Sequence, residues 1–121
     1  MTLKECYEKF GGDYNDVYSR LIKDERIEKY LRKFSESNDY DAIVASINGP
    51  DTAEAFRTVH TLKGLALNLS LSPLYEPAST LCEYLRSNPS PIDTGVTEPL
   101  LKDIKDVYDK IMICIKEYLG E

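Results

Sequence analysis

This chain of 121 residues has a single histidine, His60, and only three cysteines, Cys6, Cys82 and Cys114. The cysteines are odd in number and widely separated, which is not the spacing of zinc ligands. With one histidine to add, a zinc site would be hard to assemble. The sequence therefore predicts no metal site and three reduced, mostly buried thiols.

Long apolar runs are also missing, and this excludes a membrane-spanning helix. Residues 1–6 contain no apolar stretch of the kind a secretory signal has. Asp and Glu number 21 against 15 Lys and Arg, and the formal net charge of −6 disfavours nucleic acid and anionic membranes as partners. We expect a cytoplasmic protein, a monomer by default, that binds neither nucleic acid nor membrane.

Two patterns that enzymes of phosphate chemistry need are absent as well. No glycine-rich loop precedes a helix in the way that nucleotide binding requires, and no cluster of carboxylates could hold magnesium. A histidine-based phosphatase would need a second histidine, a general acid or a metal set, and none is present. We expect no nucleotide binding and no independent catalysis, so the chain is predicted not to be an enzyme.

What the sequence does contain is helical periodicity, with apolar residues at steps of three and four and no alternating, strand-like runs. Glycine, proline and capping residues divide the chain into separate helices. The predicted helices cover residues 3–10, 13–21 and 24–34, the third capped by Asp24, then a helix from 38 or 39 to 47, one from 51, one from 72, and a last one from 97. Whether the second and third are one bent helix stays open. Asp51 and Glu54 predict a capping box, and residues 87–95 a loop.

The long helices are joined by short connections, so neighbours should run antiparallel. The predicted fold class is all-α: an antiparallel up-down-up-down four-helix bundle with short N-terminal helices. A chain of this length forms one domain, residues 1–121. Within it we expect an N-terminal helical addition at 1–22 and the bundle at 24–121.

The helix that carries His60 has two distinct faces. Its apolar stripe, which should face the core, consists of Ala55, Val59, Leu62, Ala66 and Leu69. At about 100° per residue, His60 lies roughly 135° from the centre of that stripe and should face water. The residues predicted around it are Phe56, Arg57, Lys63, Gly64, Leu67 and Leu71.

These residue types suit a group that is handed on or off. Histidine is a covalent nucleophile, and Lys63, with Arg57 from the turn before, could neutralise the charge of an anionic group. Gly64 costs about 1 kcal/mol in mid-helix and would let a partner approach closely. Phe56, Leu67 and Leu71 would form a docking surface. The alternatives are that Gly64 permits helix packing, that Arg57 is a solvated charge, and that the three apolar residues cover the N-terminal helices.

The run His60-Thr61-Leu62-Lys63-Gly64, followed by Ala66 and Asn68-Leu69, resembles the signature of histidine phosphotransfer (HPt) domains. The order of elements is similar too. Ser70 stands where the family often has Gly, and Cys82 where it often has a Gln. The resemblance implies a phosphoryl carrier of a two-component phosphorelay.

The resemblance also implies the partners: the receiver domain of a response regulator, a hybrid histidine kinase, or both. The chain itself would need no cofactor, because Mg²⁺ and the acceptor aspartate belong to the receiver. The predicted function is that His60 accepts a phosphoryl group from a receiver aspartate or a kinase and passes it to a response-regulator receiver. The alternative is a helical docking module that is never phosphorylated and binds a receiver or a partner helix through the same face.

Overall fold

The computed structural model describes residues 1–88 and 91–121, and every regular element in them is a helix. The helices are α1 (Leu3–Phe10), α2 (Tyr14–Leu21), α3 (Asp24–Ser35), α4 (Asp39–Ile47), α5 (Thr52–Asn68), α6 (Ser72–Ser87) and α7 (Thr94–Leu119). The all-helical prediction is confirmed. Of the predicted loop at 87–95, residues 89 and 90 lie outside the described residues.

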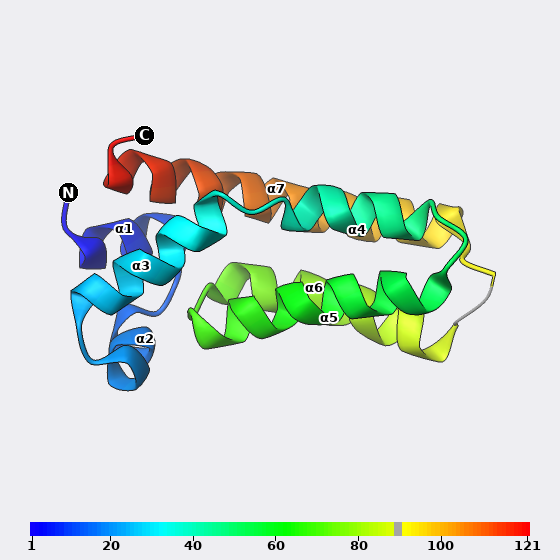
Figure 1. The fold of residues 1–121 in the computed structure, drawn as a ribbon, viewed down its shortest axis with the longest axis horizontal. Coiled ribbons are helices and arrows are strands. Elements are labelled where there is room, and N and C mark those ends of the chain that lie inside the picture. The colour runs from blue at the N-terminus through cyan, green and yellow to red at the C-terminus, as the bar shows by residue number, and fades with distance from the viewer. Residues whose placement is uncertain (89–90) are drawn as a thin grey trace.

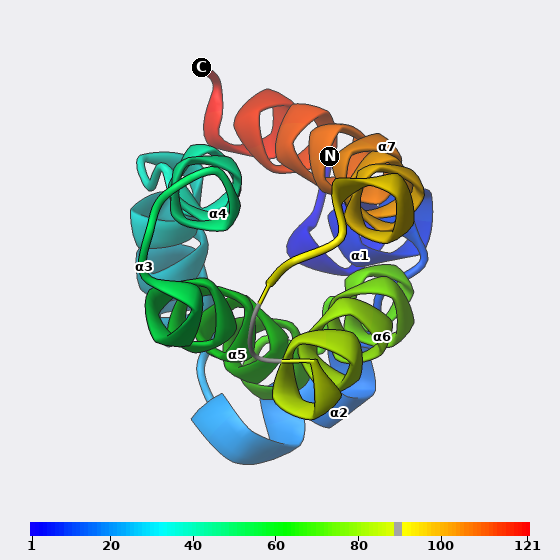
Figure 2. The ribbon, with the colours of Figure 1, turned by 90° about the vertical axis from the view of Figure 1, so that its right-hand side faces the viewer.

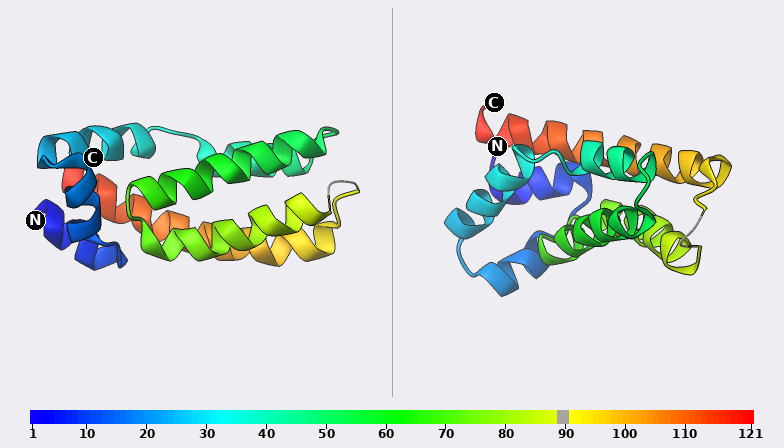
Figure 3. Two further views of the ribbon diagram at one scale, coloured as in Figure 1. Left: turned by 90° about the horizontal axis from the view of Figure 1, so that it is seen from below. Right: turned by 45° about the vertical axis from the view of Figure 1, so that its right-hand side comes forward.

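Helices α4 to α7 lie side by side around a common interior, as the end-on view shows (Figure 2). Contacts join α4 to α5, α5 to α6, α6 to α7, and α4 to α7. The three N-terminal helices gather at the end of the molecule where α7 finishes, and α1 and α3 pack on α7 (Figure 1). Seen from below, α5 and α6 run next to one another along their length (Figure 3).

The N-terminal helices are set by their caps. Thr2 and Glu5 form a capping box at the start of α1, and Gly11, in the left-handed conformation at φ 83°, ends it. Asp13 caps α2 through the amide of Asp16. Ile22 has φ 70°, which no helix tolerates, so α2 and α3 are two helices. The prediction of Asp24 as the cap of α3 is wrong by one residue, since Lys23 holds that position.

At the start of α5 the Asp51 carboxylate accepts hydrogen bonds from the amides of Ala53 and Glu54, as its capping role requires. The other half of the predicted capping box is wrong. The Glu54 carboxylate is instead hydrogen-bonded to Arg57. A charged guanidinium is the stronger donor, so the carboxylate turns along the helix rather than back to the cap.

Two helices contain an internal proline. Pro77 lies within α6, and Pro99 lies within α7, which begins at Thr94 under an Asp93 cap. The prediction that the last helix starts at Thr97 is therefore wrong by about a turn. Each proline removes one backbone N–H and so one hydrogen bond of its helix. The strong cap at Asp93 lets the chain enter α7 before Pro99.

The interior is one hydrophobic cluster that draws on all seven helices of the described chain. It includes the whole predicted stripe of α5: Ala55, Val59, Leu62, Ala66 and Leu69. The helical phase of α5, on which the orientation of His60 depends, is therefore confirmed.

Candidate functional site

His60 is exposed on the face of α5 that turns away from the buried stripe. Its imidazole lies against the ring of Phe56, one turn earlier, with 5.7 Å between the ring centroids and 37° between the planes. Phe56 is half-buried and packs against the core. The histidine is thus supported on one side by an aromatic ring and open to water on the other.

Lys63 lies one turn after His60 and is half-buried. Its ammonium lies 5.8 Å from the centre of the Tyr75 ring on α6. Lys63 belongs to none of the ion pairs formed within residues 1–88 and 91–121. Its positive charge is therefore not neutralised by a neighbouring carboxylate and is available to an incoming anion.

Gly64 borders open space. A Cβ atom built at this position would meet no other atom within 4 Å. The alternative reading, that the glycine permits close packing of helices, is excluded for the described residues, because nothing packs there. A bare stretch of backbone one turn after the histidine leaves room for another molecule.

Arg57, by contrast, is already engaged. Its guanidinium nitrogens lie 2.6 and 3.1 Å from the Glu54 carboxylate and 3.6 Å from that of Asp51. The hydrogen bond to Glu54 and the charges of both carboxylates raise the pKa of Arg57. Two negative charges therefore offset the one positive charge of Arg57 at the start of α5.

Arg86 on α6 is a residue that reasoning from the sequence missed. Its guanidinium carbon lies 5.5 Å from the centre of the Phe56 ring, on the helix next to that of His60. Its one ion pair in the described structure, to Glu83, is long at 3.4 Å. The antiparallel arrangement expected of α5 and α6 places the end of α6 opposite the start of α5, but it does not indicate which side chain of α6 reaches Phe56.

The two leucines predicted beside His60 differ in exposure. Leu67 is 58% exposed, among the most exposed large apolar side chains of the described chain. Leu71 is 0% exposed, and its assignment to a docking surface is wrong. Helix α5 ends at Asn68 and Ser70 turns the chain at φ 54°, so the helical wheel no longer applies at residue 71. The turn carries Leu71 into the core.

Cys82 on α6 is completely buried. Burial raises the pKa of its thiol, and the positive charges of Lys63 and Arg86 act in the opposite direction. The thiol cannot offer the amide hydrogen bond of the glutamine that the resembling family often has at this position.

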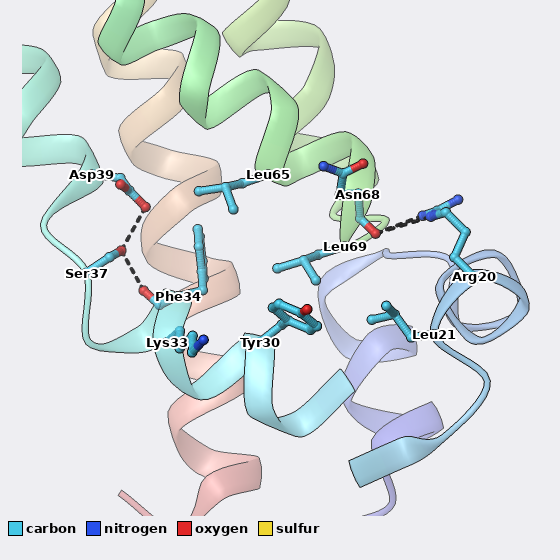
Figure 4. Close-up of a pocket in the computed structure, with 10 residues that line it drawn as sticks. All are labelled: Arg20, Leu21, Tyr30, Lys33, Phe34, Ser37, Asp39, Leu65, Asn68 and Leu69. Atoms are coloured by element: carbon cyan, nitrogen blue, oxygen red, sulfur yellow. Dashed lines mark hydrogen bonds between the residues drawn. The ribbon is translucent and has the colours of Figure 1, made fainter. Parts of the chain in front are cut away.

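Two hollows in the described surface lie against α5, one at its start and one at its end. One hollow of about 290 Å³ lies beside Phe56, between Arg57 and Arg86. Another, of about 480 Å³, lies between α2, α3 and the end of α5, and contains none of the predicted site residues (Figure 4). There Arg20 donates hydrogen bonds to the carbonyl groups of Leu67 and Asn68 at 3.0 Å each, which fixes the last turn of α5 to α2.

The structure describes no cluster of His, Cys, Asp and Glu side chains that could hold a metal ion. No helix within the described ranges is long and apolar enough to cross a membrane. What the surface does present is one histidine on an all-helical scaffold, between an aromatic ring, an unpaired ammonium and bare backbone.

The model of the Hpt domain matches residues 26–111, which is most of the chain and includes α4, α5 and α6 entirely. The chain therefore belongs to the Hpt domain family. Hpt domains are phosphocarrier modules of two-component phosphorelays, not classical enzymes, and they interact with response-regulator receiver domains or kinases. No curated protein and no solved structure matches the chain.

Proposed function

We propose that this chain carries a phosphoryl group on His60 and exchanges it with the receiver domain of a response regulator or of a hybrid histidine kinase. The observation that carries the proposal is the exposure of His60 on α5, with Lys63 unpaired and Gly64 open on the next turn, in a chain of the Hpt domain family. The face could hold a charged group and admit a second protein at the same time.

The transfer itself is a displacement at phosphorus. An imidazole nitrogen of His60 attacks the phosphorus of a receiver's phosphoaspartate with its lone pair. The P–N bond forms as the P–O bond breaks, and the aspartate leaves as a carboxylate with the electron pair of that bond. Passing the group on is the same step in reverse. The receiver supplies Mg²⁺, and this chain supplies no cofactor.

Each residue of the site has a proposed part. Lys63 neutralises the phosphoryl oxygens as a point charge, and Arg86 adds a second positive charge from α6. Arg57, offset by Glu54 and Asp51, adds less. Gly64 allows the close approach of the receiver, and Phe56 and Leu67 form its apolar contacts on the exposed face of α5.

The scaffold belongs to the proposal as well. We propose that α4 to α7 form the antiparallel up-down-up-down bundle, which the connections at alternating ends in Figure 1 support. Residues 1–121 would form one domain, with 1–22 added at the end of the bundle. The carrier acts as a monomer in the cytoplasm, where its three free thiols remain reduced.

The test is to incubate the purified chain with a phosphorylated receiver and to follow the phosphate. Phosphohistidine is expected, and it differs from phosphoserine in being labile to acid and stable to base. The chain would be a docking module instead if it binds the receiver but never acquires acid-labile phosphate. That result would leave the docking face intact and remove the carrier function.

A further inference from the structure

The ammonium of Lys63 has a neighbour that neither the signature nor the periodicity of the sequence indicates. It lies 5.8 Å from the centre of the Tyr75 ring, across the α5–α6 contact. A cation within about 6 Å of an aromatic centroid is attracted by the negative face of the ring. The contact joins the turn that follows His60 to the first turn of α6.

The Tyr75 ring is in a position to hold the ammonium still. Tyr75 is half-buried and packs against the core, so its ring is fixed by the bundle. Lys63 has a flexible four-carbon stem, and no described carboxylate pairs with it. The ring contact is therefore the interaction within residues 1–88 and 91–121 that can hold the ammonium in place.

The residues one turn before and one turn after His60 each form a cation–π contact with α6. Phe56, on the preceding turn, is covered by Arg86, and Lys63, on the following turn, is covered by Tyr75. His60 lies between these two contacts on α5. The Lys63–Tyr75 contact thus fixes the ammonium of the residue that lies one turn after His60.

We propose that Tyr75 is a positioning residue that holds the Lys63 ammonium beside His60 for the transferred phosphoryl group. This inference rests on the proposed function. At the position where the family often has a glutamine, this chain has the buried Cys82. Tyr75 would be a different residue of α6 that acts on the site. The ring face is the active part, because the Tyr75 hydroxyl forms no hydrogen bond with any described residue.

The experiment is a double-mutant cycle on single-turnover transfer from a phosphorylated receiver, with Tyr75→Leu, Lys63→Ala and the double variant. Tyr75→Leu should slow transfer by about two- to fivefold, which is the range of a cation–π contact near the surface. It should have no further effect in the Lys63→Ala chain. Tyr75→Phe keeps the ring and should transfer at the rate of the unaltered chain. The affinity for the receiver should be the same for all the variants.

The matched control is another lysine–tyrosine contact, Lys105 over Tyr40 at 5.2 Å, which joins α7 to α4 away from His60. Tyr40→Leu should change thermal stability and not the transfer rate. If Tyr75→Leu does not fold, Tyr75→Met takes its place in the cycle. Equal slowing by the Tyr75 change with and without Lys63 would overturn the proposal and make Tyr75 a packing residue.

The outcomes separate the two levels of inference. If the unaltered chain acquires no phosphohistidine, the proposed function fails. If it does, and the cycle shows no coupling between Lys63 and Tyr75, the carrier function stands and the positioning role fails.

Discussion

At the scale of single residues, the site depends on contrasts between neighbours. His60 and Val59 are adjacent in sequence, yet one is exposed and the other is wholly buried. Lys63 and Arg57 are both cations near the histidine, yet among the described residues only Arg57 has carboxylate partners. Under the proposed function, burial and pairing, more than residue type, decide which side chains are free to act on a phosphoryl group.

The first prediction concerns the proposed acceptor. His60→Gln should abolish phosphorylation, because no other histidine exists in the chain. The free energy of unfolding should change by no more than about 0.5 kcal/mol, since the side chain is exposed. Radiolabel transfer and thermal unfolding by circular dichroism measure the two effects. Acid-labile phosphate on the variant would contradict the assignment of His60.

The second prediction compares two arginines of equal charge. Arg86→Gln should slow phosphoryl transfer by roughly two- to tenfold, and Arg57→Gln should have a smaller effect, because Glu54 and Asp51 already offset the charge of Arg57. Each variant is the control for the other, as both remove one exposed guanidinium. A larger effect at Arg57 would show that its ion pairs open when the receiver binds.

At the scale of the helix, α5 could be predicted well from the sequence up to its last turn. The steps of three and four in its apolar residues determine the buried stripe, and this fixes the direction of His60, Gly64 and Leu67. Leu71 could not be placed this way, because the wheel continues only while the helix does. The left-handed turn at Ser70, a residue that seldom adopts it, gives no clear signal in a sequence.

Helical periodicity could not predict the two residues that α6 contributes to the site. Periodicity describes one helix at a time, whereas Tyr75 and Arg86 reach the site only because α6 packs against α5 in one particular register. That register follows from the packing of side chains across two helices, and it is not encoded in either helix alone.

The third prediction tests the open backbone at Gly64. Gly64→Ala should stabilise the fold by up to about 1 kcal/mol, since the new methyl group meets no atom within 4 Å and a mid-helix glycine is unfavourable. Gly64→Gln should leave the protein folded and impair transfer by obstructing the receiver. Denaturant unfolding and transfer rates measure the two effects, and normal transfer by the glutamine variant would exclude close approach at this position.

The fourth prediction separates the two leucines. Leu67→Asp should weaken receiver binding with little change in melting temperature, because the side chain is 58% exposed. Leu71→Asp should unfold or strongly destabilise the domain, because it places a charge in the core. Binding by calorimetry and unfolding by circular dichroism should therefore respond in opposite ways. Unfolding of the Leu67 variant would mean that this residue is part of the core.

At the scale of the whole molecule, the N-terminal helices are bound closely to the bundle. The Tyr7 hydroxyl on α1 donates a buried hydrogen bond of 2.8 Å to the carbonyl of Leu69, just past the end of α5. Cys6 lies against α7, with its sulfur 3.6 Å from the carbonyl oxygen of Cys114, and burial raises the pKa of its thiol to about 11. The helix that carries His60 is thus held at its far end by a segment that precedes residues 26–111, the part matched by the family model.

The last prediction follows from that attachment. A chain that lacks residues 1–22 would lose four side chains that are no more than 2% exposed, Cys6, Tyr7, Phe10 and Val17, and would uncover the part of the hydrophobic core that they cover. Truncation of even one large buried side chain typically costs about 2–5 kcal/mol, so the shortened chain should melt far lower or not fold.

The matched point variant is Tyr7→Phe, which keeps the ring and removes only the hydrogen bond to Leu69. It should lose about 1–3 kcal/mol of stability, because the Leu69 carbonyl is left without that donor. Thermal and denaturant unfolding measure both variants, and transfer to His60 at a temperature where each is folded shows whether the end of α5 affects the site. An unchanged melting temperature in the truncated chain would mean that the bundle needs nothing before α3.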